Sequence, residues 1–234
     1  MGRIITIANQ KGGVGKTTTA INLSACLAEA GQHVMLVDFE PQGNASSGLG
    51  VEKEDYEHTV YDMMAEEADL DECLVKNIQD NLDVLPSDMN LAGAEIEFQE
   101  VEDKETLLKR YLDKVRDNYD FILIDCPPSL NILTINALTA ADTVLVPIQC
   151  EYYALEGLNQ VLKTVELVKR KLNPQLELEG VVFTMYDART NLSLQVVESV
   201  KNNLNQTIYK TIIPRNVRLA EAPSHGMPIN LYDT

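Results

Sequence analysis

The first 31 residues combine an apolar run, a glycine-rich turn and a helical pattern, and this order restricts the fold more than any other feature of the chain. Residues 3–8, RIITIA, predict a buried strand because they are mostly apolar and end at a turn. Residues 16–30 carry apolar side chains at helical spacing, and Gly31 suits the position just after a helix. The turn between them, KGGVGKTTT, offers backbone N–H groups and a helix N-terminus to an anion. This order predicts a phosphate cradle between the strand and the helix.

The side chains of this turn are those that phosphate and Mg²⁺ chemistry needs. Its glycines let the backbone curl without side-chain clashes, and Lys16 would reach the terminal phosphates. Thr17 would bind Mg²⁺, and Thr18 is placed for the α-phosphate. The usual pattern G-x-x-x-x-G-K-[ST] is not met, because its first glycine would fall at Gln10; a second lysine, Lys11, follows instead. The alternative is a turn that only starts a helix. The predicted nucleotide-binding residues of the turn are Lys11, Gly12, Gly13, Val14, Gly15, Lys16, Thr17 and Thr18.

Strands rich in Val, Ile and Leu alternate with helical patterns along the rest of the chain. This alternation predicts an α/β fold, with a mostly parallel twisted sheet flanked by helices on both faces. Residues 45–105 are the least regular part and are expected to form an insertion or a lid. The further strands are expected at 33–38, 80–87, 119–129, 142–149, 178–186 and 206–214, and the further helices at 105–118, 130–142, 154–172 and 191–204.

Carboxylates stand at or just beyond the ends of two predicted strands. Asp125 ends FILID, and the carboxyl ends of parallel strands meet at one edge of a sheet, so it should lie beside the glycine-rich turn and hold a Mg²⁺ water. Asp38 ends the strand at 33–38, and Glu40 follows it in a turn. These two carboxylates could position an attacking water or a Mg²⁺ water. The alternative for all three is that they only cap the turns that follow the strands.

The charge of the chain is strongly uneven. Of its 234 residues, 19 are Lys or Arg and 36 are Asp or Glu, which gives a formal net charge of −17. Residues 52–105 hold 19 of the acidic residues and only 3 Lys, whereas residues 169–218 hold 8 basic and 4 acidic residues. The total argues against a nucleic-acid partner, but binding to phosphate depends on a local patch. Each charged segment could equally be an ordinary solvated surface.

Cysteine spacing and hydropathy bear on metal sites, disulfide bonds and membrane-spanning segments. The 4 Cys residues form no CxxC pair, so neither a zinc site nor a disulfide framework is indicated. No run approaches the roughly 20 apolar residues that a membrane helix needs. A cytoplasmic protein without a membrane partner is expected.

Five segments in order carry a resemblance: KGGVGKTTT, DFEPQGNASSGLG, IDCPPSL, MYDARTNL and IIPRNVRLAEAPSHGMP. Together they resemble ParA/Soj-type partitioning ATPases of the ParA/MinD deviant-Walker P-loop family, over nearly the whole chain. The resemblance implies one P-loop ATPase domain over residues 1–234 that hydrolyses ATP to ADP and phosphate with Mg²⁺. It also implies a homodimer with ATP, non-specific DNA binding by that dimer, nucleoid association, a role in chromosome or plasmid partitioning, and a ParB-like centromere-binding protein that stimulates hydrolysis.

The resemblance assigns roles to residues around the turn. Lys11 matches the signature lysine, which reaches across the dimer to the partner's nucleotide. Lys16, Thr17 and Asp125 match the phosphate and magnesium positions. The family's DxD motif reads Asp38-Phe39-Glu40 here, so a longer side chain stands at the position tied to the hydrolytic water. We expect slow hydrolysis with ATP binding retained. The implied catalytic residues are Lys11, Lys16, Asp38 and Glu40.

Four residues nearer the C-terminus also match the family. Arg189 and Arg218 match basic positions implicated in DNA binding, whereas Pro214 and Asn216 match a loop on the adenine side of the nucleotide. The family usually continues into a C-terminal helix, which the sequence lacks after Thr234. The sequence therefore leaves open what that helix would contribute to packing or DNA contact.

Two other functions remain open from the sequence. One is an ATP-dependent scaffold or regulator that positions another cell component without binding DNA. The other is a P-loop biosynthetic enzyme of the dethiobiotin synthetase type, which would need a small-molecule pocket. DNA retardation that requires ATP and weakens with salt separates the partitioning function from the first alternative.

Overall fold

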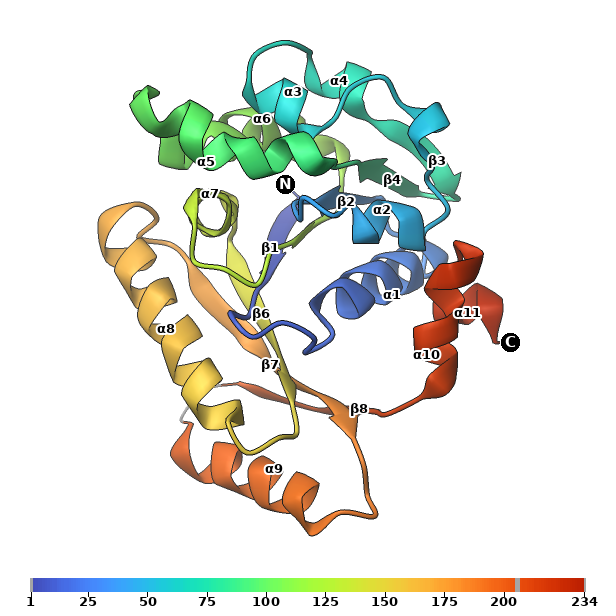
Figure 1. The fold of residues 1–234 in the computed structure, drawn as a ribbon, viewed down its shortest axis with the longest axis vertical. Helices are drawn as coiled ribbons and strands as arrows, with labels where there is room; N and C mark the ends of the chain where they lie inside the picture. Colours follow the sequence, from blue (N-terminus) through green and yellow to red (C-terminus); the bar gives the residue numbers. More distant parts are fainter. Residues whose placement is uncertain (1, 205–206, 234) are drawn as a thin grey trace.

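A computed structural model describes residues 2–204 and 207–233, and its centre is one eight-stranded sheet in the order β3-β4-β2-β5-β1-β6-β7-β8 (Figure 1). All neighbouring strands are parallel except β3 and β4, which are antiparallel. The predicted α/β fold with a mostly parallel sheet is confirmed. The strands are β1 (Arg3–Ile7), β2 (Val34–Asp38), β3 (Val75–Gln79), β4 (Leu82–Leu85), β5 (Phe121–Asp125), β6 (Thr143–Gln149), β7 (Glu177–Tyr186) and β8 (Ile208–Pro214).

Strand β1 lies between β5 and β6, and its neighbours bring the predicted carboxylates to one edge. In the register of the sheet Ile7 pairs with Asp125, and Asp125 pairs in turn with Asp38. All three residues end their strands, so both carboxylates stand level with the point where the chain leaves β1 for the glycine-rich turn. This is the edge of a parallel sheet at which ligands bind.

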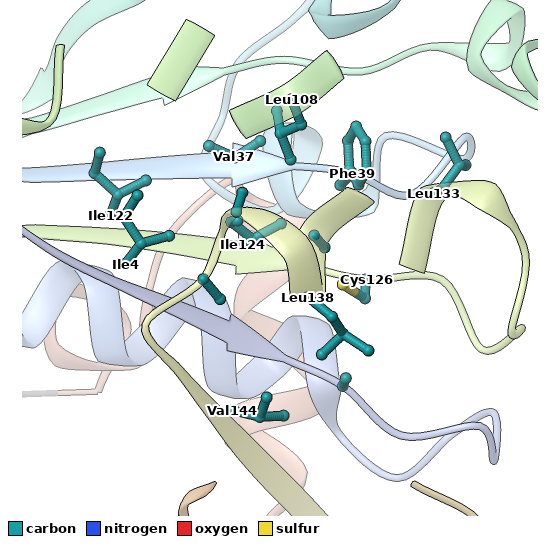
Figure 2. Close-up of a cluster of buried hydrophobic side chains, with 14 of the residues drawn as sticks. Ile4, Val37, Phe39, Leu108, Ile122, Ile124, Cys126, Leu133, Leu138 and Val144 are labelled. Carbon is teal, nitrogen blue, oxygen red and sulfur yellow. The ribbon is translucent and has the colours of Figure 1, made fainter. Parts of the chain in front are cut away.

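Two apolar clusters cover the two faces of the sheet. Residues alternate along β1, so that Ile5 packs with helix α1 on one face while Ile4 packs on the other with α6, α7 and α8. Figure 2 shows part of the cluster that contains Ile4. Ile4, Ile122 and Ile124 extend from the strands, and Leu108 and Leu138 come from α6 and α7. Helices therefore flank both faces, as predicted. The helices are α1 (Lys16–Glu29), α2 (Asn44–Gly48), α3 (Val60–Met64), α4 (Leu70–Cys73), α5 (Ala94–Glu97), α6 (Leu107–Val115), α7 (Ile132–Ala140), α8 (Ala154–Lys171), α9 (Asn191–Asn203), α10 (Val217–Glu221) and α11 (Ile229–Tyr232).

The irregular segment contains a strand that the sequence pattern did not indicate. Strand β3 forms the antiparallel edge of the sheet through a tight turn at residues 80–81. Its sequence VKNIQ mixes polar and apolar residues, and Asn77 has a positive φ of 53°, which breaks the alternation expected of a strand. The helix expected at 105–118 is also shorter, because 3₁₀ turns at 104–106 and 116–118 flank α6. The strand expected from residue 206 begins at Ile208, and residue 206 itself lies outside the described part.

Candidate functional site

The glycine-rich turn connects β1 to α1 and is built on two residues with left-handed backbone conformations. Gly13 has a φ of 72° and Gly15, the N-cap of α1, has a φ of 87°. Residues with a Cβ rarely adopt these angles, so the glycines allow the tight curl. The Thr184 hydroxyl donates a 2.8 Å hydrogen bond to the backbone oxygen of Val14 and ties the turn to β7. The turn is therefore held in place with its exposed glycines and the start of α1 available to an anion.

Lys16 places a buried ammonium group inside the turn. Its Nζ donates a 3.4 Å hydrogen bond to the backbone oxygen of Lys11. Burial is the main cause that lowers the pKa of Lys16, and the negative charge of Asp125 acts in the opposite direction. A buried ammonium group next to a helix N-terminus is stabilised when an anion such as a phosphate lies beside it.

Asp125 has the properties expected of a group that serves a cation. Its side chain is fully buried, and among the described residues neither carboxylate oxygen has a hydrogen-bond partner of ordinary geometry. Burial, followed by the negative charge of Asp38, raises its pKa to about 8, although the Thr17 hydroxyl lies close enough to lower it. A buried carboxylate without partners is costly unless a positive ligand or its water occupies the site.

The donor set around Asp125 fits magnesium rather than a closed protein cage. Within the part of the chain that the structure describes, no cluster of three or more His, Cys, Asp or Glu side chains could hold a metal ion. Mg²⁺ usually keeps several waters and uses one or two carboxylates together with the phosphates of its substrate. Thr17 and Asp125 would be the contribution of the protein to a Mg²⁺ ion that arrives with a nucleotide.

Asp38 holds the turn that carries Glu40. Its Oδ2 accepts hydrogen bonds of 2.8 Å from both the backbone N–H and the hydroxyl of Ser46, and its Oδ1 accepts one of 3.3 Å from the backbone N–H of Glu40. Ser46 lies in α2 and did not stand out in the sequence, because a serine within NASSG is also explained by turn chemistry. The structure thus gives Asp38 an anchoring position at the base of the turn, with its oxygens already in use.

The buried carboxyl of Asp38 predicts a pH effect on stability. Burial raises its pKa from 3.8 to about 6, so the folded chain keeps a proton that the unfolded chain has already lost in this range. The free energy of unfolding without nucleotide or Mg²⁺ should therefore fall as pH rises through this window, by about 1–3 kcal/mol from this group. Urea unfolding across the window should show a flatter profile for Asp38→Asn. Asp80→Asn, which changes an exposed carboxylate, should keep the wild-type slope; equal slopes for all three proteins would contradict the assignment.

The Glu40 side chain is half-buried near Lys16. Burial is the main cause that raises its pKa, and the Lys16 ammonium lowers it. Glu40 in turn acts on the pKa values of Lys16 and Asp125. The charges of Glu40, Lys16 and Asp125 are therefore close enough to act on one another.

Lys11 lies on the other side of the turn and has a partner that the sequence did not indicate. Its Nζ forms an ion pair with Glu151, which precedes α8. Its backbone N–H donates a 3.0 Å hydrogen bond to Oδ1 of Asn9, and Asn9 Nδ2 donates one of 2.8 Å to the backbone oxygen of Pro147. Contacts between residues this far apart in the chain leave no local pattern, although the polar Asn9 directly after a buried strand was a signal.

The adenine-side residues line a cavity next to the turn. Pro214 and Asn216 share a cavity of about 630 Å³ with Gly15 and Thr18. Asn216 also caps α10, since its Oδ1 accepts a 2.8 Å hydrogen bond from the backbone N–H of Arg218. Gly15 and Thr18 thus connect the lining of this cavity to the glycine-rich turn.

The two predicted DNA-binding arginines stand on different segments, and each pairs with a nearby carboxylate. The Arg189 guanidinium donates hydrogen bonds of 2.9 and 2.7 Å to the two carboxylate oxygens of Asp187. Arg218 donates one of 3.2 Å to Glu221. Both side chains are exposed, so they remain accessible to a phosphate backbone, but each charge is partly compensated within the chain.

Known proteins are similar to this chain over nearly its whole length. The family model described as an AAA domain matches residues 2–178. The sporulation initiation inhibitor protein Soj of Bacillus subtilis is 60% identical over 233 residues, which cover 100% of this chain and 92% of Soj. The chromosome partitioning protein ParA of Caulobacter vibrioides is 52% identical over 233 residues, or 99% of this chain and 87% of ParA.

A solved structure of another protein with a bound nucleotide is also similar to this chain. Cobyrinic acid a,c-diamide synthase from Mycobacterium smegmatis, with a bound ATP analogue and magnesium, is 39% identical with a TM-score of 0.87, covering 93% of this chain and 86% of that chain. Within the described residues no helix is both long and apolar enough to span a bilayer. The resemblance inferred from the five sequence segments is confirmed, and the chain belongs to the Soj/ParA family of partitioning ATPases.

Proposed function

We propose that this chain is an ATP- and Mg²⁺-dependent dimerising switch for chromosome or plasmid partitioning. One observation carries the proposal: Lys16 is buried within the glycine-rich turn, and the buried carboxylate of Asp125 lies near it at the ligand-binding edge of the sheet. The names of the related Soj and ParA proteins support the partitioning role. We also propose that residues 1–234 act as one ATPase domain, which the single sheet supports.

The phosphate end of the site assigns a task to each side chain. Lys16 would bind the terminal phosphates, Thr18 the α-phosphate, and Thr17 with Asp125 the Mg²⁺ ion and its waters. When bound, Mg²⁺ neutralises phosphate charge during transfer to water. The remaining residues contribute position and charge, since phosphoryl transfer needs little covalent chemistry from the protein.

Glu40 and Asp38 would divide the work of hydrolysis. Glu40 stands beside Lys16 with a half-buried carboxylate and would orient the attacking water. Asp38 would act as a positioning residue, because its oxygens already hold Ser46 and the backbone of Glu40. The length of the Glu40 side chain makes hydrolysis slow.

Lys11 would complete the site of a second copy. Its ammonium group is part-exposed at the rim of the turn, whereas Lys16 already serves the nucleotide of its own chain. An ATP-bound pair of chains would therefore enclose two nucleotides, each contacted by the Lys11 of the opposite chain. ATP controls the assembly because the terminal phosphate is part of the interface.

We further propose that the ATP-bound dimer binds DNA without sequence preference, through Arg189 and Arg218. The double variant Arg189→Glu, Arg218→Glu should weaken retardation of plasmid DNA by roughly tenfold or more at low salt, because phosphate contacts supply most of non-specific affinity. Lys76→Glu, Lys109→Glu makes the same charge change elsewhere and should retard DNA like wild type. If the ATP-bound arginine variant still retards DNA as wild type does, the assignment is wrong.

A second function is favoured by the pairing of both arginines. Arg189 and Arg218 are each bound to a carboxylate of their own chain, which suits a positioning scaffold that uses ATP but does not touch DNA. Retardation that appears only with ATP and weakens with salt supports partitioning; its absence from a chain that dimerises with ATP supports the scaffold.

The proposed partitioning function also includes a ParB-like partner that stimulates hydrolysis and a location on the nucleoid.

A further inference from the structure

The ion pair between Lys11 and Glu151 joins two parts of the chain that flank the nucleotide site. Lys11 opens the glycine-rich turn after β1, and Glu151 lies between β6 and α8. The two side chains are 37% and 46% exposed, so the pair lies at the surface rather than in the core. The ammonium group proposed to serve a second copy is therefore already engaged within its own chain.

Both partners are mounted on fixed backbone. The backbone of Lys11 is held by Asn9, whose amide also binds Pro147 at 2.8 Å and so links the turn to β6. The backbone oxygen of Glu151 accepts a 3.0 Å hydrogen bond from the N–H of Ala154 at the start of α8. Because both backbones are already hydrogen-bonded, the pair needs little further ordering of the main chain.

Exposed aromatic side chains lie next to the pair in the sequence. Tyr152 and Tyr153 directly follow Glu151 and are 78% and 64% exposed, with their rings in an edge-to-face contact at 5.1 Å. Leu130, which shares a small crevice with Gln10 of the turn, is 46% exposed. Exposed aromatic side chains next to a site are typical of a protein interface.

We propose that Glu151 is a positioning residue that clasps Lys11 on its own chain, and that this ion pair opens when a second copy docks with ATP. The inference rests on the proposed function, since it needs the dimer in which Lys11 crosses to the opposite nucleotide. The clasp keeps Lys11 from that position until the phosphates of ATP compete with the Glu151 carboxylate. The ion pair therefore opposes dimerisation without ATP and raises the protein concentration needed for dimerisation with ATP.

The size of the effect follows from the exposure of the pair. Exposed ion pairs stabilise their closed form by about 1.5- to 5-fold in equilibrium constant. Two clasps open in each dimer, so their loss should strengthen dimerisation by roughly 2- to 25-fold. An ion pair of this strength changes the affinity of dimerisation but does not prevent dimerisation.

The clasp itself can be tested on the nucleotide-free chain. Glu151→Gln keeps the shape of the side chain and removes its charge, whereas Glu156→Gln removes an exposed charge from the first turn of α8 and is the matched control. Pulse labelling of lysine amines, read by mass spectrometry, should show Lys11 modified about 1.5 to 5 times faster in Glu151→Gln. Equal labelling in Glu151→Gln, Glu156→Gln and wild type would overturn the clasp, whatever the protein does with ATP.

The consequence for assembly is read separately by light scattering at rising protein concentration with Mg-ATP. Glu151→Gln should dimerise at lower concentration than wild type and Glu156→Gln, while the affinity for Mg-ATP measured under monomeric conditions stays the same. Faster labelling together with unchanged or weaker dimerisation would overturn the regulatory role of Glu151. If labelling responds but neither wild type nor Glu151→Gln dimerises with ATP, the proposed function fails, and with it the regulatory role, while the ion pair stands.

Discussion

Replacing Lys16 with alanine is expected to weaken Mg-ATP binding by at least about 100-fold, because truncating one member of a buried charge pair costs several kcal/mol. The ammonium is buried in the turn and its pKa is lowered by burial, so in the free chain it is a charge in need of an anion. Isothermal titration calorimetry with wild type and Lys16→Ala measures the loss.

A charge-matched control makes this prediction specific. Lys109 lies on α6, part-exposed, and pairs with Asp113. Lys109→Ala should bind Mg-ATP like wild type. An affinity of Lys16→Ala within about threefold of wild type, in a sample shown to be folded, would mean that the phosphates bind elsewhere.

Shortening Glu40 to aspartate is expected to raise the rate of ATP hydrolysis by about 10- to 100-fold. The extra methylene of Glu displaces the carboxylate by about 1 Å, and a misplacement of this size can lower a rate by about 100-fold. Phosphate release at saturating Mg-ATP gives the rate. The affinity for ATP should change little, because the phosphates are held mainly by the turn and Lys16.

The same substitution at an exposed site controls for the loss of a methylene. Glu54 is exposed in the segment after α2, so Glu54→Asp should leave the rate unchanged. A wild-type rate that equals or exceeds that of Glu40→Asp would show that the longer side chain is no handicap, and Glu40 would then lose its assigned role.

The central sheet could be predicted because its strands are buried on both faces. Near-continuous apolar runs such as FILID leave few other structures possible, and parallel topology follows from the helices between them. The edge strand β3 could not be predicted, because its side chains are part-exposed and mixed in polarity. What makes VKNIQ a strand is pairing with β4, which is a tertiary contact.

The candidate site could also be predicted only in part. The glycine-rich turn and Asp125 were visible because local backbone geometry and the end of a strand determine them. The partner of Lys11 was not visible, since Glu151 lies 140 residues away and meets it only because α8 packs against β6, the neighbour of β1. The use of Asp38 as an anchor was hidden for a related reason: its role depends on where Ser46 folds back.

ATP bound at the turn should join two chains through Lys11, and light scattering measures this change of mass. Wild type should have the mass of one chain without nucleotide or with ADP, and twice that mass with Mg-ATP. Lys11→Ala should bind Mg-ATP yet keep the mass of one chain. A wild-type mass that does not change when saturating Mg-ATP is added, or a Lys11→Ala variant that dimerises as wild type does, would contradict the account.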